Sequence, residues 1–228
     1  MAEPTVDPQF AAAVADRLAA VRDRVSAAGG SNVGILAVTK SFGLDACWAA
    51  HLAGCVGVGE NYAQELVGKF SGHEVPWSVH FIGQLQTNKV RLVAPYVSVV
   101  ESVDRPSLVA ELARRMPTTR VLVQVDTVGG GHGRGGCPVD QVPALVDAAR
   151  AANLDVAGLM TVGPPDADPV TTRAGFRLVR SLVDRLGLLT CSMGMSADLE
   201  IAVQEGSTQV RVGSALFGER PLPPPAAR

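Results

Sequence analysis

Eight short apolar segments, with seven stretches of helical spacing between them, constrain the fold of this chain more than any other feature. Most of them are apolar at consecutive positions, which is typical of parallel strands covered on both faces. They span residues 33–38, 55–58, 79–82, 97–100, 121–125, 154–160, 191–193 and 209–212. Strands that alternate with helices in this way build a parallel sheet with crossover connections.

The segments between these strands predict helices. They span residues 44–52, 62–70, 87–93, 105–115, 139–152, 170–186 and 197–204. We expect Asp104 and Ser196 to act as N-caps. An open doubly wound sheet and a closed barrel both fit a chain of 228 residues, but eight strands favour the barrel. We therefore predict an α/β protein with a single (β/α)₈ TIM barrel over residues 31–220.

Both ends of the chain are predicted to lie outside the barrel. An extra helix is expected within residues 1–30, because five apolar residues recur at spacings of three or four and Gly29-Gly30 then ends the pattern. These five are Phe10, Val14, Leu18, Val21 and Val25. The proline-rich tail at 221–228, PLPPPAAR, cannot continue a helix or a central strand, so we expect a disordered extension.

Composition excludes several classes of function. A net charge of −2 and a pI of about 6.1 provide no basic field for nucleic acid. The four cysteines form no CxxC pair, which argues against a zinc site or a disulfide framework. No apolar stretch has the length of a membrane span, and the N-terminus lacks the basic region of a signal peptide. We expect a cytoplasmic protein without a metal site.

Polar residues follow the seventh and eighth strands in the strings SMGMS and RVGSALFGER. The loops after these two strands are the usual phosphate site of such barrels. Ser196, Gly213, Ser214 and the backbone of Met195 are therefore candidates to bind phosphate. The alternative is that the glycines only form tight turns and that Ser196 only caps a helix.

Lys40 directly follows the first predicted strand, in VGILAVTK. Most lysines at strand ends are simply solvated, but desolvation on the barrel rim lowers a lysine pKa and frees the amine to attack a carbonyl. A phosphate-bearing aldehyde held by the last two loops would reach this amine, which is the chemistry of pyridoxal 5′-phosphate (PLP). Arg211 lies beside Gly213 and would meet the pyridine ring, or else pair with a carboxylate.

Long strings along the chain also point to a known family. They are ILAVTK, GVGENYAQEL, WSVHFIGQLQTNK, VESVDR, VLVQVD, GLMTVGP and CSMGMSADLEIAVQEGSTQVRVGSALFGER. On these strings the chain resembles the pyridoxal phosphate homeostasis proteins, the single-domain relatives of the alanine racemase N-terminal domain (fold type III). The resemblance implies PLP as cofactor, with Lys40 as the lysine of the internal aldimine and Arg211 facing the pyridine nitrogen. It further implies a lining made by Asn61, His80, Met193, Gly194, Met195, Ser196, Gly213 and Ser214.

The resemblance implies a protein that carries PLP as a Schiff base and acts in intracellular vitamin B6 homeostasis, with PLP-dependent apoenzymes as recipients. Fast turnover is not expected, because a cation at the pyridine nitrogen disfavours ring protonation and weakens the cofactor as an electron sink. The chain also lacks the second domain of alanine racemases, so we expect a monomer. The alternative is a small PLP-dependent amino acid racemase; a Schiff-base aldolase is less favoured, because no acid–base pair is evident near Lys40.

One segment departs from the family pattern. Many members carry a Ser-Lys-x-Gly string after the fifth strand, whereas this chain reads DTVGGGHGRGGCP and places Arg134 at the position of that lysine. Arginine does not form a Schiff base but still binds phosphate. A second covalent site is therefore not expected. The loop also lacks the GK[ST] ending of a P-loop, so we predict a mobile segment rather than a nucleotide site.

Overall fold

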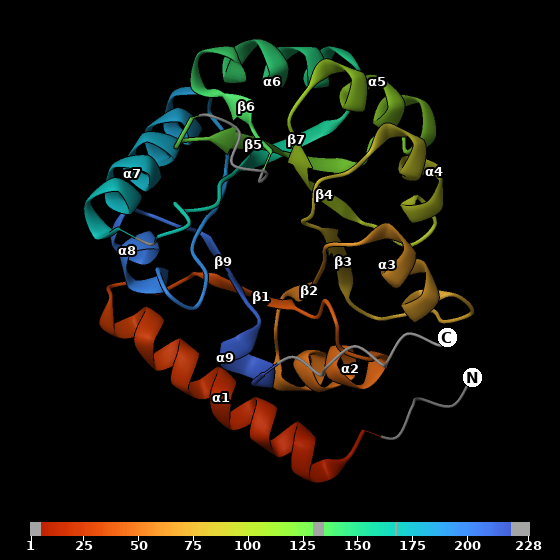
Figure 1. The fold of residues 1–228 in the computed structure, drawn as a ribbon, viewed down its shortest axis with the longest axis vertical. Coiled ribbons are helices and arrows are strands. Elements are labelled where there is room, and N and C mark those ends of the chain that lie inside the picture. Colours follow the sequence, from red (N-terminus) through yellow and green to blue (C-terminus); the bar gives the residue numbers. More distant parts are fainter. Residues whose placement is uncertain (1–5, 130–134, 167, 220–228) are drawn as a thin grey trace.

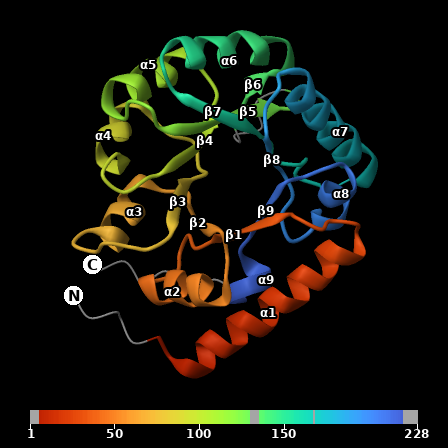
Figure 2. The same ribbon diagram turned by 180° about the vertical axis from the view of Figure 1, so that it is seen from behind.

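The computed structural model describes residues 6–129, 135–166 and 168–219. Within them, eight parallel strands close into a ring, because β1 pairs with β9 and β4 pairs with β5 (Figures 1 and 2). This confirms the predicted (β/α)₈ barrel. The strands are β1 (Gly34–Val38), β2 (Gly57–Glu60), β3 (Ser78–Phe81), β4 (Val99–Val103), β5 (Arg120–Asp126), β7 (Asp155–Met160), β8 (Thr190–Ser192) and β9 (Gln209–Val212).

Helices form the outer layer of the barrel (Figure 1). They are α2 (Leu44–Ala53), α3 (Ala63–Phe70), α4 (Val90–Val93), α5 (Pro106–Arg115), α6 (Val142–Ala151), α7 (Pro169–Arg185), α8 (Leu199–Gln204) and α9 (Ser214–Phe217). Short 3₁₀ turns, η1 (Thr87–Lys89) and η2 (Val139–Gln141), precede α4 and α6. The helices predicted over 87–93 and 139–152 are thus each a 3₁₀ turn followed by an α-helix.

Two short elements were not predicted from the sequence. The two-residue strand β6 (Cys137–Pro138) pairs with β5 outside the ring, and α9 directly follows Gly213. Each is too short to produce a period in the sequence. Arg134 and the tail at 221–228 lie outside the described residues.

The two predicted N-caps are wrong. α5 begins after Arg105, with Pro106 at its first position, and the carboxylate of Asp104 instead accepts a hydrogen bond from the Arg105 guanidinium. α8 begins only after Asp198, whose carboxylate accepts a hydrogen bond from the backbone N–H of Met195. Ser196 therefore lies in the loop before the helix, and its hydroxyl is not used as a cap.

The predicted N-terminal helix is α1 (Pro8–Ala27), which lies outside the barrel along α2, α8 and α9 (Figure 1). Asp7 caps it by accepting hydrogen bonds from the backbone N–H groups of Gln9 and Phe10. Its buried face consists of Val14, Leu18, Val21 and Val25. This apolar face closes the side of the barrel next to β1 and β9, the two strands that carry Lys40 and Arg211 at their ends.

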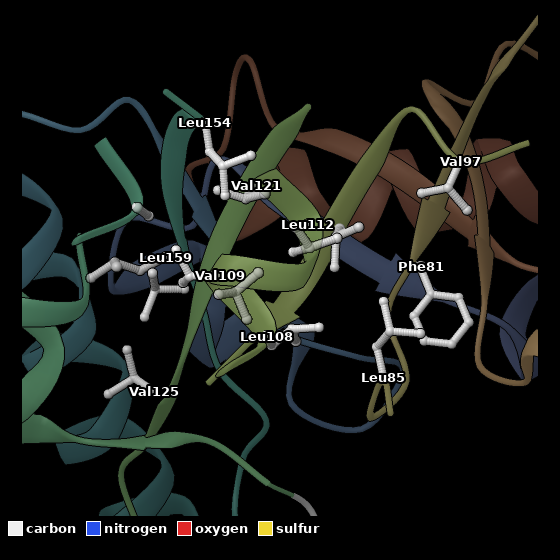
Figure 3. Packing of buried hydrophobic residues seen from close by; sticks show 14 of the residues in the cluster. Phe81, Leu85, Val97, Leu108, Val109, Leu112, Val121, Val125, Leu154 and Leu159 are labelled. Carbon is white, nitrogen blue, oxygen red and sulfur yellow. The ribbon is translucent and has the colours of Figure 1, made fainter. Parts of the chain in front are cut away.

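The rest of the core lies between the strands and the outer helices. Figure 3 shows Leu108, Val109 and Leu112 projecting from α5 toward the strands, among them Val121 of β5. Each fully buried side chain of this kind contributes roughly 1.5–3 kcal/mol. In the described part of the chain, no helix has the length and apolar character needed to cross a membrane.

Candidate functional site

Two adjoining cavities open where the barrel strands end. The first has a volume of about 270 Å³ and lies at the ends of β1, β8 and β9. The second has a volume of about 350 Å³ and extends toward the ends of β2, β3, β5 and β7. Both are lined by Val38, Lys40, Met195 and Arg211. Lys40 follows β1 by two residues, so the loop after the first strand places its amine at the junction of the two cavities.

Small polar groups line the far end of the first cavity. Ser196 follows β8 and Ser214 follows β9, and their hydroxyl oxygens lie 3.4 Å apart. Gly213 lies between Ser214 and the end of β1, where a Cβ atom would come within 3.2 Å of the Val38 carbonyl oxygen. A glycine therefore lets these two strand ends approach closely. Two hydroxyls beside an unhindered backbone form a suitable cradle for a phosphate group.

Carboxamides dominate the polar lining of the second cavity. Asn61, Gln84 and Gln124 contribute side chains to it, and Gly83 contributes backbone. Glycine is required at position 83, because a Cβ atom there would lie 2.1 Å from the Asn61 carbonyl oxygen. Among the described residues that line the two cavities, Lys40 and Arg211 are the only acidic or basic side chains.

Arg211 is fixed between the two cavities by hydrogen bonds to the barrel interior. Its Nη1 atom donates to the carbonyl and hydroxyl oxygens of Ser192 at 2.8 Å each, and its Nη2 atom donates to the Thr161 carbonyl oxygen at 2.7 Å. Burial lowers the pKa of Arg211 and the nearby Glu101 carboxylate opposes this shift, but an arginine stays charged at any working pH. The site therefore contains a permanent, immobile cation.

Glu101, at the centre of β4, anchors the network behind Arg211. Its Oε1 atom contacts His80 Nδ1 at 2.5 Å and accepts a hydrogen bond from Gln209 Nε2 at 2.7 Å, while Oε2 accepts one from the Ser192 hydroxyl at 2.7 Å. Burial by itself raises the pKa of Glu101, but the hydrogen bond and charge of His80, together with Arg211 and Ser192, lower it overall. Glu101 is therefore a buried carboxylate that the fold stabilises in its ionised form.

Replacing Glu101 with glutamine is expected to remove a pH-dependent contribution to stability. A carboxyl whose pKa is lowered in the folded state stabilises the fold above its unfolded value of 4.5, and this contribution is lost as the pH falls through the folded pKa. Near neutral pH, the variant should lose about 2–3 kcal/mol of unfolding free energy. The difference between variant and wild type should shrink below pH 4.5.

Urea unfolding at a series of pH values measures this difference. Glu111→Gln is the control, because Glu111 only bridges Arg114 and Arg115 on the surface of α5. Surface ion pairs contribute little to stability, so its unfolding free energy should depart from wild type much less than that of Glu101→Gln. A constant difference between Glu101→Gln and wild type across the acidic range would contradict the assignment.

The structure brings most of the predicted site residues together. Those that line the cavities are Lys40, Asn61, Met195, Ser196, Arg211, Gly213 and Ser214. Three others are not part of the described lining. His80 is bound to Glu101, Met193 is fully buried against Cys191, and Gly194 accepts a hydrogen bond from the Arg211 backbone N–H at 2.9 Å. These three residues support the cavity walls from behind.

Several residues of the site were not singled out by sequence reasoning. Glu101 and Gln209 lie inside strands that otherwise read as buried, and a polar residue within an apolar run was the only available signal. Gln84 and Gln124 line the second cavity, but glutamine carries no specific chemical signature. Their roles depend on strand register, which is not visible in one sequence.

Comparisons with known proteins agree with this geometry. Residues 11–221 match the family described as alanine racemase, N-terminal domain. The pyridoxal phosphate homeostasis protein of Pseudomonas aeruginosa is 41% identical over 224 residues, covering 94% of this chain and 97% of the relative. The chain belongs to the pyridoxal phosphate homeostasis protein family. The resemblance noted in its sequence strings is thereby confirmed.

Solved structures relate the fold to other members of the wider group. PipY of Synechococcus elongatus PCC7942, solved with PLP bound, superposes with a TM-score of 0.77 at 29% identity, covering 90% of this chain and 100% of PipY. Alanine racemase from Corynebacterium glutamicum has a TM-score of 0.73 at 16% identity. This homeostasis-family chain covers 61% of that racemase, and the similarity between the two concerns the fold alone.

Proposed function

We propose that this protein binds PLP, holds it as a Schiff base on Lys40 and acts in intracellular PLP homeostasis. The observation that carries the proposal is the position of Lys40 between a hydroxyl-lined cavity and a carboxamide-lined cavity, both bordered by Arg211. The PipY structure with PLP bound and the names of the curated relatives support it.

The described residues fit each polar group of PLP. Ser196, Gly213 and Ser214 would form the cradle for the phosphate, since the two hydroxyls lie close together. Arg211 would face the pyridine nitrogen with a guanidinium that hydrogen bonds to Ser192 and Thr161 hold in place. Asn61 borders the second cavity beside Lys40 and is positioned to bind a polar substituent of the ring. His80, Met193 and Gly194 act from behind the wall.

When bound, PLP would supply an aldehyde carbon, and Lys40 would be the residue that holds it. Schiff-base formation with a bound aldehyde would use the Nζ atom of Lys40 as the amine and would release one water molecule. Because Arg211 keeps its charge, it would serve as a hydrogen-bond donor to the pyridine nitrogen and would disfavour protonation of that atom. This arrangement favours retention of PLP over withdrawal of electrons from a bound amino acid.

The lining also bears on the alternative, a small PLP-dependent amino acid racemase. Racemisation needs a proton donor or acceptor on each face of the cofactor. In the described lining, Lys40 is the one side chain able to serve, since Arg211 does not release its proton. We infer that exchange of amino acid α-protons is slow. We further propose that the bound PLP is passed on to PLP-dependent apoenzymes.

The proposal is tested by adding PLP to the purified protein, reducing with borohydride and mapping the peptides by mass spectrometry. The chain contains three lysines, Lys40, Lys69 and Lys89, so the modified peptide identifies the lysine that reacted. We expect a near-visible absorption band and a pyridoxyl adduct on the Lys40 peptide. An adduct confined to Lys69 or Lys89 would overturn the site, and α-deuterium incorporation into alanine at about 1 s⁻¹ or faster would favour the racemase.

We also propose that the protein is monomeric and works in the cytoplasm. The four cysteines are all unpaired thiols, which suits a reducing compartment. Burial raises the pKa of Cys47 and of Cys191 to about 12, so neither thiol competes with Lys40 as a nucleophile for the aldehyde.

A further inference from the structure

A second buried ionic cluster lies behind Lys40, on the outer side of the barrel between β2 and α3. Lys69, in the last turn of α3, donates to Glu60 Oε1 at 2.6 Å, and the Thr39 hydroxyl donates to the same oxygen at 2.6 Å. The Lys69 side chain is 5% exposed and that of Glu60 is fully buried. None of these three residues is part of the described lining of the two cavities that border Lys40.

The cluster reaches the backbone on both sides of Lys40. Lys69 Nζ donates to the Thr39 carbonyl oxygen at 2.8 Å. Glu65, one turn earlier on α3, accepts a hydrogen bond from the Ser41 backbone N–H and contacts Lys69 Nζ at 3.3 Å. The residues before and after Lys40 are thus bound to two neighbouring side chains of one helix.

The turn held by these contacts is strained. Ser41 has a φ of 69°, a left-handed conformation that costs a residue with a side chain about 1 kcal/mol or more. The Phe42 backbone N–H also donates to the Thr39 carbonyl oxygen at 3.0 Å, so the turn closes on the atom that Lys69 binds. Without these contacts, Ser41 would relax toward a negative φ and change the direction in which Lys40 points.

Because its charges are buried, the Lys69–Glu60 pair is expected to fix the position of the Lys40 turn more than to stabilise the fold. Removing two charges from water costs as much as their attraction returns in many proteins. Among the described residues, Glu60 Oε2 is buried without a hydrogen-bond partner, and burial raises the pKa of Glu60 although Lys69 and Thr39 oppose the shift. An apolar contact between β2 and α3 would stabilise the fold equally well.

We propose that Lys69 and Glu65, with Glu60 orienting Lys69, are positioning residues that hold the Lys40 turn in the geometry needed for Schiff-base formation. This inference rests on the proposed function. It assigns a role to a buried lysine that makes no Schiff base itself, and it links α3 to the reactivity of the cofactor site.

The test compares two ligands. PLP carries the aldehyde, whereas pyridoxine 5′-phosphate has the same ring and phosphate but cannot react with an amine. Glu65→Ala removes the acceptor of the Ser41 N–H, and it is expected to weaken PLP binding about tenfold while leaving the Kd of pyridoxine 5′-phosphate within about twofold of wild type. Glu65→Gln retains an acceptor oxygen and should bind PLP almost as wild type does.

Two further variants are compared: Lys69→Met as a second test of the positioning role and Glu111→Ala as a control. Lys69→Met should lower the yield of borohydride-stable adduct on Lys40 at least as much as Glu65→Ala. Glu111→Ala is the matched control, because Glu111 is 21% exposed, close to the 28% of Glu65, and binds only surface arginines on α5. It should bind both ligands like wild type.

The possible outcomes separate this inference from the proposed function. Equal weakening of both ligands by Glu65→Ala, or no change in PLP binding, would overturn the positioning role. Failure of the wild type itself to form the Lys40 adduct would overturn the proposed function instead. If Lys69→Met does not fold, the comparison of Glu65→Ala with Glu65→Gln still decides, because Glu65 is partly exposed.

Discussion

Replacing Lys40 with alanine is expected to abolish the borohydride-stable adduct with PLP. Lys40 borders both cavities, whereas Lys69 is buried in its ionic cluster. Lys89 lines a neighbouring cavity, which shares Asn61 and Gln84 with the second cavity but is not lined by Lys40. No other lysine is available in the chain. The variant should keep the phosphate cradle and still bind pyridoxine 5′-phosphate with wild-type affinity, because that ligand forms no covalent bond.

Absorption spectra and peptide mapping after reduction measure this loss. Lys89→Ala is the matched control and should retain both the absorption band and the adduct. An intact band in Lys40→Ala would mean that another amine captures the aldehyde. Equal loss of pyridoxine 5′-phosphate binding would show that Lys40 holds the cavity open and does not act chiefly as the nucleophile.

The barrel and the rim residues were predictable from the sequence for one physical reason. Strands covered on both faces are apolar throughout, so the runs at 33–38 and 209–212 are visible without knowledge of their neighbours. Once the strands are known, the polar residues that follow them fall on one rim. Lys40, Ser196 and Gly213 could therefore be placed near one another although they are far apart in the chain.

The residues behind the rim could not be placed in this way. Contact between Glu101 and Gln209 depends on how β4 and β9 are staggered across the barrel interior, and the two residues are 108 positions apart. The Lys69–Glu60 pair depends on which face of α3 turns toward β2. The Asp104 and Ser196 caps were wrong because a nearby arginine and Asp198, respectively, supplied competing contacts.

The two buried networks have different tasks on opposite sides of the barrel wall. Inside, Glu101 and Ser192 fix Arg211, the group proposed to face the ring nitrogen. Outside, Lys69 and Glu65 fix the turn that carries the proposed nucleophile. Arg211 and the Lys40 turn are thus both held in place by buried charged side chains that do not themselves line the cavities.

Replacing both Ser196 and Ser214 with alanine is expected to weaken PLP binding about a hundredfold or more. In the proposed site each hydroxyl would donate a hydrogen bond to the phosphate. A hydrogen bond to a charged group contributes about 1.5–3 kcal/mol, or roughly ten- to a hundredfold in affinity. Neither serine caps α8, and the two hydroxyls lie 3.4 Å apart, so both can reach one phosphate.

Equilibrium titration with PLP and with unphosphorylated pyridoxal measures whether Ser196 and Ser214 bind the phosphate group. The double variant should bind pyridoxal about as poorly as wild type does, because that ligand never contacts the cradle. Ser181→Ala is the control, since the Ser181 hydroxyl donates only to the Leu178 carbonyl oxygen on the exposed face of α7. Equal losses for the two ligands would place the phosphate elsewhere on the rim, and an unchanged PLP affinity would leave the backbone at Gly213 as the anion site.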